Sequence, residues 1–223
     1  MANFGFGHLT VVAPYEPHWQ EAKSAVGASE ILQHAKLAST LAEAVQDCTL
    51  VLGTGTSTHR KPEQPLVPLN EMGPLVTAQQ NGGRIGLVFG PEKHGLTRED
   101  LSYCHLLIEI PTDPLQPSMN LGQAAAVCLY EFAARSEPIA SRPSNATIQS
   151  AENPPLASGQ LDVLGGLIGE VMAAAGYSPK NMEDANRHDL RLMLRRLRLN
   201  AADYRRVLGL FRRILWRLAP PPP

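Results

Sequence analysis

The stretch "GRIGLVFGPEKHGLTREDLSYCHLLIEIPTDPLQPSMNLGQAAAVCLYE", residues 83–131, alternates β-rich apolar runs with turn-forming and helix-forming segments. Apolar runs of this length, bounded by Gly, Pro and Ser, are typical of buried strands, whereas the alanine-rich end has helical character. The pattern predicts strands over 84–90 and 105–111 and helices over 97–104 and 118–135. Strands that alternate with helices predict an α/β domain with a parallel sheet.

The same alternation extends towards the N-terminus. It predicts strands over 8–14 and 49–54, helices over 29–46 and near 74–81, and a proline-rich loop over 61–74. Beyond residue 135, Pro, Ser, Asn and Ala dominate, which is typical of a flexible linker. Helical patterns then return over 161–175 and 187–218. We therefore expect three parts: a domain over 1–135, a linker over 136–160 and a helical extension over 161–219.

Three loops follow three of the predicted strands and are rich in short polar residues and glycine. They read "GTGTSTHR" (53–60), "FGPEKHGL" (89–96) and "IPTDPLQPSMN" (110–120). Open parallel sheets bind ligands at the carboxyl ends of their strands, so these loops are the candidate site. Taken singly, each loop has a purely structural interpretation, because Ser118 has the position of a helix N-cap and Thr97 with Asp100 that of a capping box.

Composition limits the classes of protein to consider. No apolar stretch has the length of a membrane span, and no signal peptide is recognisable, so we expect no membrane partner. Cys48, Cys104 and Cys128 are distant from one another, and no His or Cys spacing indicates a metal site. We expect three buried thiols, a cytoplasmic protein and no metal.

The net charge of −1 conceals a strong asymmetry. Ten arginines and two aspartates between Arg187 and Arg217 give this segment a charge of +8, which leaves −9 on the rest of the chain. Leu190, Met193 or Leu194, and Leu197 mark an apolar helix face, and three arginines lie on another face. Those arginines, predicted to contact RNA phosphates, are Arg191, Arg195 and Arg198. The alternative interpretation is an ordinary solvated helix face.

The opening stretch closely resembles the motifs of the SPOUT class of RNA methyltransferases, and within it the TrmH/TrmJ ribose 2′-O-methyltransferases. "DCTLVLGT" (47–54) and "LRRLRLNAADYRRVLGLFRRI" (194–214) resemble the same family, so the resemblance runs from Phe4 to Leu218. The motif positions present here are Phe89, Gly90, Glu92, Gly95, Leu96, Ile110, Pro111, Ser118, Asn120, Leu121 and Ala124.

The resemblance implies a SPOUT-type parallel sheet with a C-terminal trefoil knot, a homodimer, and S-adenosylmethionine as the methyl donor to a ribose 2′-hydroxyl of tRNA. It implies catalytic roles for Ser118, Asn120 and Glu92, where Glu92 either acts directly or stabilises its loop. The implied cofactor-binding residues are Thr54, Gly55, Thr56, Gly90, Ile110, Pro117, Ser118 and Met119. An rRNA substrate, or RNA binding without catalysis, are the alternatives.

Two departures from the family pattern bear on activity. Ser57 stands where TrmJ-like members usually carry an arginine, and Arg60 is the nearest replacement. "MANFGFGHLTVVAP" (1–14) resembles the interior of the family's first motif region. Relative to the family, the first strand, the first helix and an early arginine are missing, so we expect an N-terminally truncated chain with little activity.

Overall fold

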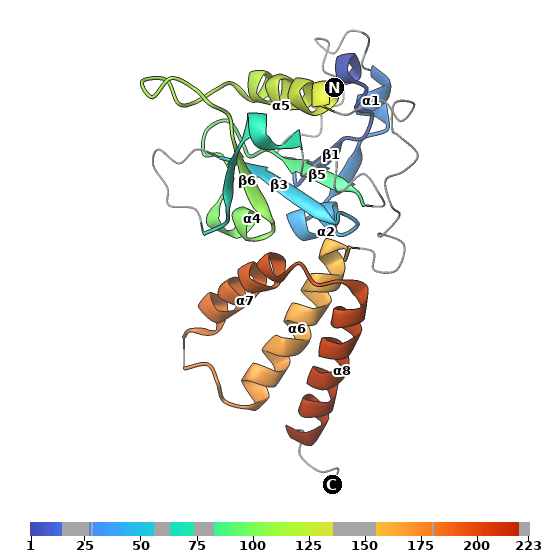
Figure 1. Ribbon diagram of the computed structural model, residues 1–223, viewed down its shortest axis with the longest axis vertical. Helices are drawn as coiled ribbons and strands as arrows, with labels where there is room; N and C mark the ends of the chain where they lie inside the picture. The colour runs from blue at the N-terminus through green and yellow to red at the C-terminus, as the bar shows by residue number, and fades with distance from the viewer. Residues whose placement is uncertain are drawn as a thin grey trace.

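The computed structural model describes residues 1–14, 27, 29–55, 63–73, 83–135, 155–179 and 181–218. It has an α/β part followed by three C-terminal helices (Figure 1). The strands are β1 (Thr10–Val12), β2 (Lys36–Ala38), β3 (Leu50–Thr54), β4 (Leu66–Pro68), β5 (Ile85–Val88) and β6 (Leu106–Glu109). The helices are η1 (Ala2–Phe4), α1 (Ser29–Gln33), α2 (Leu41–Val45), η3 (Leu69–Glu71), α4 (Arg98–Ser102), α5 (Leu121–Arg135), α6 (Ser158–Ala174), α7 (Glu183–Leu197) and α8 (Ala201–Leu218).

The six strands of the described residues pair in parallel, as the alternation predicts. The larger sheet has the order β4-β6-β3-β5, and β1 pairs with β2 in a separate two-stranded sheet. The strand β4 was missed within the predicted proline-rich loop. It lies at the edge of the sheet, where Pro68, which has no backbone N–H, costs no ladder hydrogen bond.

Helices cover both faces of the larger sheet, because successive strand residues point to opposite faces. On one face, Leu52 and Ile108 pack with Cys128 and Phe132 of α5. On the other face, Val51 and Leu107 pack with α2 and with Cys104, which follows α4. Figure 1 shows α5 on one side of the sheet and α2 and α4 on the other. The three cysteines are free and buried, as expected.

The helix predicted over 29–46 is wrong, because a strand interrupts it. Residues 36–38 form β2, and a new helix, α2, begins after Thr40. The Thr40 side chain accepts a hydrogen bond from the Glu43 N–H, and the Glu43 carboxylate accepts one from the Ser39 N–H at 2.8 Å. The first amides of a helix have no partner within the helix, and these two bonds satisfy the amides of Ser39 and Glu43. They therefore favour the start of a new helix at this point.

The helix predicted over 187–218 is also two helices. Arg198 has a φ of 45°, a left-handed conformation that ends α7. The Asn200 side chain then accepts hydrogen bonds from the N–H groups of Ala202 and Asp203, both at 2.9 Å, and begins α8. The chain therefore turns back, and α8 packs on α6 through Tyr204, Val207, Leu208 and Phe211.

The helical part is docked on the α/β part at two places. The first two amides of α6, on Ser158 and Gly159, donate to the carbonyls of Cys48 at 2.7 Å and Gln46 at 3.0 Å. An added Cβ on Gly159 would lie 3.2 Å from the Gln46 oxygen, so a side chain there would push the helix away. The segment predicted as linker is thus ordered from residue 155 onwards; residues 136–154 lie outside the described residues.

The second docking place is a group of arginines on α7. Arg195 is 2% exposed, and its guanidinium donates to the Tyr103 carbonyl at 3.0 Å, to the Ser158 hydroxyl at 3.2 Å and to Asp162 at 2.9 Å. Arg191 donates to Glu99 and Ser102, and its guanidinium carbon lies 4.2 Å from the centre of the Tyr103 ring. Because α7 bonds to α4 and the residue after it, the helices and the sheet form one body.

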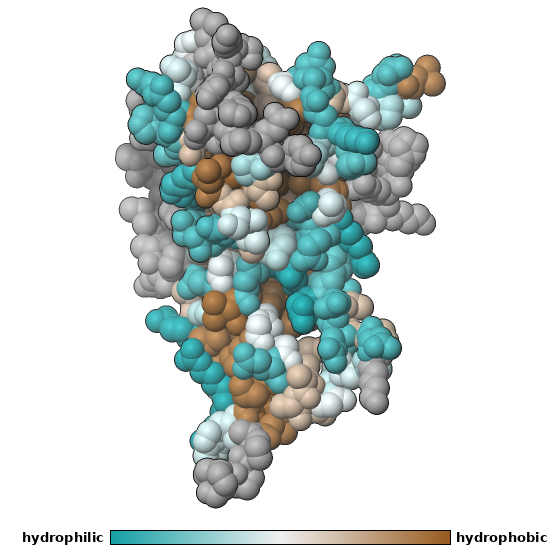
Figure 2. Space-filling view, turned by 180° about the vertical axis from the view of Figure 1, so that it is seen from behind, coloured by the Kyte–Doolittle hydropathy of each residue, from teal (hydrophilic) through white to brown (hydrophobic). Residues whose placement is uncertain are grey.

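Apolar side chains remain exposed on the outside of the helical part. Figure 2 shows them gathered along the C-terminal helices, on the side turned away from the viewer of Figure 1. Val163, Leu210 and Trp216 are each more than half exposed. No helix in the described part of the chain is long and apolar enough to cross a membrane.

His105 joins β3 to β6 as a neutral imidazole. Its Nδ1 accepts a hydrogen bond from the Val51 N–H at 3.0 Å, and its own backbone N–H donates to the Val51 carbonyl at 2.8 Å. Burial lowers the pKa of His105 to about 3, and the charges of Arg195 and Arg198 act in the same direction. An accepting Nδ1 carries no proton, so the hydrogen bond and the low pKa describe the same neutral state.

We expect acid to destabilise the fold through His105. The unfolded imidazole titrates near pH 6.5, so between about pH 6.5 and 3 the unfolded chain binds a proton that the folded chain does not. Stability is therefore fully present above pH 6.5 and falls as the pH drops, by up to about 1.4 kcal/mol per unit. In His105→Asn, whose amide oxygen can accept the same bond, melting temperatures should fall less between pH 7 and 4. His34→Asn, at an exposed histidine, should behave like the parent.

Candidate functional site

The carboxyl ends of β3, β5 and β6 meet at one edge of the larger sheet. The register pairs Gly53 with Val88 and Thr54 with Ile108, so the three predicted loops begin side by side. The Thr54 hydroxyl donates to the Val88 carbonyl at 3.2 Å, and the Gly55 N–H donates to the Ile108 carbonyl at 3.1 Å. The loop after β3 is thus tied to both neighbouring strands. Thr56, Ser57 and Arg60 lie outside the described residues.

The loop after β5 folds back on itself directly beyond Gly90. The Gly95 N–H donates to the Pro91 carbonyl at 2.7 Å, and Gly95 has a φ of 64°. A Cβ on Gly90 would lie 2.2 Å from the Gly95 carbonyl carbon and 2.3 Å from the Leu96 nitrogen. Gly90 is therefore required by the backbone of its own loop, and not only by space for a ligand.

Glu92 fastens this loop to the one that follows β6. Its Oε1 accepts hydrogen bonds from the Asn120 amide at 2.7 Å and from the Leu121 N–H at 3.2 Å. The Asn120 oxygen in turn accepts from the N–H groups of Gly122 and Gln123, so Asn120 caps α5. A carboxylate at a helix N-terminus is stabilised by the helix dipole. The structure thus brings Glu92 and Asn120 together.

The loop after β6 is held by its own residues. The Asp113 carboxylate accepts from the Leu115 N–H at 2.8 Å, and the Thr112 hydroxyl donates to the Pro117 carbonyl at 3.4 Å. Ser118 is exposed, and Pro117 and Met119 are half-buried. The N-cap position expected for Ser118 belongs instead to Asn120, two residues later.

The small residues of α5 are not its most closely packed ones. Gly122 and Ala126 are exposed, and Ala124 and Ala125 are half-buried. The helix is anchored instead by Cys128, Leu129 and Phe132, each less than a tenth exposed. Val127 and Tyr130, on the other face, are exposed, and so is Leu121 at the start of the helix.

A cavity of about 270 Å³ lies elsewhere, at the amino ends of β3 and β6. Thr49, Leu50 and His105 line it from the sheet, and Arg195 and Arg198 from the helical part. It is at the opposite edge of the sheet from the three loops. Parallel sheets bind ligands at the carboxyl ends of their strands, and the motif residues also lie there, so we place the candidate site at the loops.

The expected RNA contacts of α7 need correction. Arg195 is buried and Arg191 is bound to Glu99 and Ser102, so neither guanidinium is available to a phosphate. Of the predicted three, Arg198 alone is exposed. The helical period separated the arginines from the apolar face of the helix. It could not show that the arginine face is itself covered by another part of the protein.

The comparisons with known proteins agree with this geometry. The sequence pattern of the SpoU rRNA Methylase family matches residues 1–130. The tRNA (cytidine/uridine/adenosine-2′-O-)-methyltransferase TrmJ of Pseudomonas aeruginosa is 38% identical over 132 residues, which are 59% of this chain and 51% of that protein. The tRNA (cytidine/uridine-2′-O-)-methyltransferase TrmJ of Escherichia coli K12 is 29% identical over 211 residues, 94% of this chain and 85% of that protein.

A solved structure has the same architecture. The crystal structure of TrmJ from Z. mobilis ZM4 superimposes with a TM-score of 0.80 at 27% identity, over 96% of this chain and 89% of that one. The superposition includes the C-terminal helices as well as the sheet, since it covers nearly the whole chain. On the motif residues at the sheet edge and the match over 1–130, the chain belongs to the SpoU rRNA methylase family.

Proposed function

We propose that this protein transfers a methyl group from S-adenosylmethionine to a ribose 2′-hydroxyl of tRNA. One observation carries the proposal: the hydrogen bonds of Glu92 to Asn120 and Leu121, which join the loops after β5 and β6 beside β3. These residues belong to the family's motifs, and relatives matched over most of this chain are named tRNA 2′-O-methyltransferases. The trefoil knot and a cytoplasmic location are part of the same proposal.

The residues at the sheet edge suit a nucleoside-like cofactor. Half-buried Ile110, Pro117 and Met119 offer apolar walls, and Gly55 has space beside it, since an added Cβ would meet Leu107 only at 3.8 Å. Mixed apolar walls with a few fixed polar groups are typical of such sites. Thr54, Thr56, Gly90 and Ser118 complete the proposed set. When bound there, S-adenosylmethionine supplies an electrophilic methyl group.

The chemistry demands alignment and a proton acceptor. Methyl transfer would require the ribose 2′-oxygen to be aligned with the methyl group, and the hydroxyl proton would pass to a nearby base or to water. We assign Ser118 and Asn120 to orienting the reactants at the mouth of the loops. Glu92 is better suited to positioning than to taking the proton, because its Oε1 already accepts two hydrogen bonds.

RNA binding is best supported on α8. Its five arginines, at 205, 206, 212, 213 and 217, are all exposed. At 100° per residue they fall within an arc of about 140°, opposite the side that packs on α6. Trp216 lies in that arc, 60% exposed, with the Arg213 guanidinium carbon 4.3 Å from its ring centre. Arginines interleaved with an exposed aromatic ring suit phosphates and unstacked bases. Arg198, at the start of the turn into α8, would extend this surface.

A homodimer completes the proposal. The exposed face of α5 carries Val127 and Tyr130, and Leu121 is exposed immediately after the Asn120 cap, so a second copy seated there would lie beside the loops. A two-fold interface uses the same patch on both subunits, and an apolar helix face is suited to that purpose.

The activity is tested with purified protein, tRNA and labelled S-adenosylmethionine. Cofactor affinity is measured by calorimetry, and 2′-O-methylation by nucleoside analysis. Glu92→Ala should weaken cofactor binding at least tenfold, because charge-assisted hydrogen bonds that fix both loops are worth about 1.5–3 kcal/mol each. Glu170→Ala, at an exposed carboxylate of α6, should match the parent. If the protein binds the cofactor and methylates rRNA but not tRNA, rRNA is the substrate. If it binds the cofactor and methylates neither RNA, a non-catalytic RNA-binding role is favoured.

The RNA surface is tested with two variants of equal charge change. Arg213→Gln/Arg217→Gln should weaken tRNA binding and reduce the slope of log K against log [salt] by roughly one for each phosphate that the variant no longer neutralises. Arg187→Gln/Arg196→Gln removes two exposed arginines of α7 and should leave the slope near that of the parent. Equal slopes for both variants would mean that α8 is not the RNA surface.

The oligomeric state is measured by light scattering at micromolar concentration, with a dimer expected. Val127→Asp places a charge in the proposed interface and should give a monomer, because an unpaired charge is costly to bury. Val163→Asp, on an exposed apolar position of α6, should remain dimeric. A monomeric parent would contradict the dimer, and dissociation by Val163→Asp alone would move the interface to the C-terminal helices.

A further inference from the structure

His188 of α7 is a buried histidine whose ring nitrogen lacks a hydrogen bond. The residue is 9% exposed, and its Nε2 is fully buried with no hydrogen-bond partner among the described residues. Buried polar atoms in folded proteins are nearly always satisfied, so an exception calls for a physical reason such as an ion.

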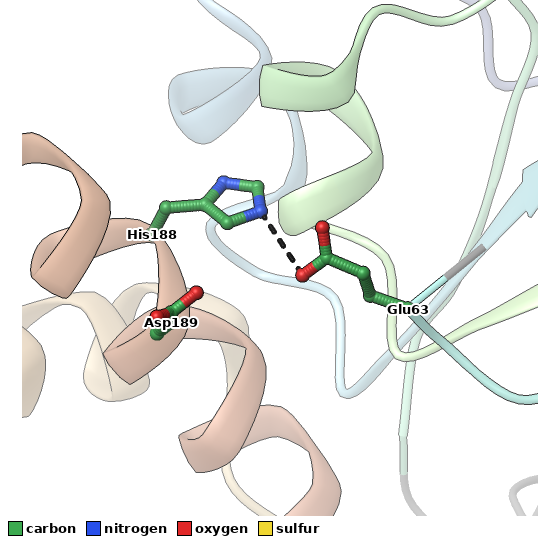
Figure 3. A group of neighbouring side chains, drawn as sticks. All are labelled: Glu63, His188 and Asp189. Atoms are coloured by element: carbon green, nitrogen blue, oxygen red, sulfur yellow. Dashed lines mark ion pairs between the residues drawn. The ribbon is translucent and has the colours of Figure 1, made fainter. Parts of the chain in front are cut away.

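Two carboxylates lie near this histidine. Glu63 reaches it from the segment before β4, and Asp189 follows it on α7 (Figure 3). One ligand atom from each of the three residues lies within 4.8 Å of the other two. Figure 3 shows the Nε2 edge of the His188 ring directed at the Glu63 carboxylate. The arrangement brings together residues that are more than a hundred positions apart in the sequence.

The separation of His188 and Glu63 fits a shared ion better than a hydrogen bond. The Nε2 atom and Oε2 of Glu63 are 3.5 Å apart. A good N–H···O bond has its heavy atoms about 2.7–3.2 Å apart. Two ligand atoms that each lie about 2.1 Å from a tetrahedral zinc ion are separated by about 3.4 Å. The observed distance is thus that of neighbouring ligands.

Glu63 is held in the orientation that such a site requires. Its other oxygen, Oε1, accepts hydrogen bonds from Nε and Nη2 of Arg98 at 3.0 and 2.8 Å. Oε2 is thereby left facing His188. Carboxylates that ligate metals are commonly oriented by hydrogen bonds of this kind. The side chains of Glu63, Asp189 and Arg98 together carry one net negative charge, which a divalent cation would offset.

We propose that Glu63, His188 and Asp189 bind a divalent metal ion, preferentially Zn²⁺, and that this ion fastens α7 to the segment before β4. One imidazole nitrogen and two carboxylate oxygens form a ligand set that zinc accepts, with a fourth position for water. Magnesium prefers oxygen ligands in octahedral geometry, so it fits less well. The site is separate from the loops of the proposed methyl transfer, and its test does not depend on that activity.

The test is a titration of the whole 223-residue protein with Zn²⁺, followed by calorimetry and by melting temperature. The parent should bind one zinc ion per chain through this group and melt at a higher temperature with the metal, because the ligand binds the folded state. Asp189→Asn and His188→Gln should each weaken zinc binding at least tenfold and lose the rise in melting temperature. Mg²⁺ at the same concentration should leave the melting temperature unchanged.

Matched controls separate this site from general effects of charge. Asp184→Asn removes a carboxylate from the same helix, and His8→Gln removes an exposed histidine elsewhere; both should bind zinc like the parent. If His188→Gln does not fold, Asp189→Asn decides, because Asp189 is exposed and its amide causes no core strain. The proposal is overturned if the parent binds no zinc stoichiometrically, or if Asp189→Asn binds it with unchanged affinity.

Discussion

Arg195 brings a permanent positive charge into the contact between the sheet and the C-terminal helices. Its guanidinium bonds to Tyr103, Ser158 and Asp162, which come from the α/β part and from α6. Removing one partner of a buried charge pair leaves the other uncompensated, at a typical cost of about 3–5 kcal/mol. That is a large share of the roughly 5–15 kcal/mol that stabilises an ordinary domain. Arg195 is therefore a main determinant of the position of α7, beside the bonds of Arg191 and the backbone bonds that dock α6.

The same contact determines what the remaining arginines can do. Arg191 and Arg195 face inward, so the RNA surface that we propose depends on α8, whose outer face is left free by the packing of α6 against its apolar side. At the opposite edge of the sheet, Glu92 plays a comparable part on a smaller scale. It joins a strand-end loop to a helix N-terminus through two hydrogen bonds. The arginines of α7 and Glu92 both position the proposed surfaces through polar contacts between segments that are distant in sequence.

Sequence patterns predicted the elements whose boundaries have local causes. The capping box of Thr97 and Asp100 is present at the start of α4, and the strands near 50, 85 and 106 follow their apolar runs. The three-residue strands β2 and β4 were missed, because so few residues show no period and β4 ends in proline. The Thr40 and Glu43 spacing was a usable signal for the start of α2. Burial of Arg195, by contrast, depends on Tyr103 and Asp162, and no local pattern contains that information.

The long-range contacts of α7 can form only after the ribosome has made both of the segments that they join. The bonds of Arg191 to Glu99 and of Arg195 to Tyr103 each join residues 92 positions apart. At a synthesis rate of about 5–20 residues per second, roughly 5 to 18 seconds separate the emergence of the two sides from the ribosome. During that interval the surface formed by α4 and Tyr103 is complete in sequence but uncovered. In a nascent chain of this protein, Glu99, Ser102 and Tyr103 thus lack their arginine partners until the last helices arrive.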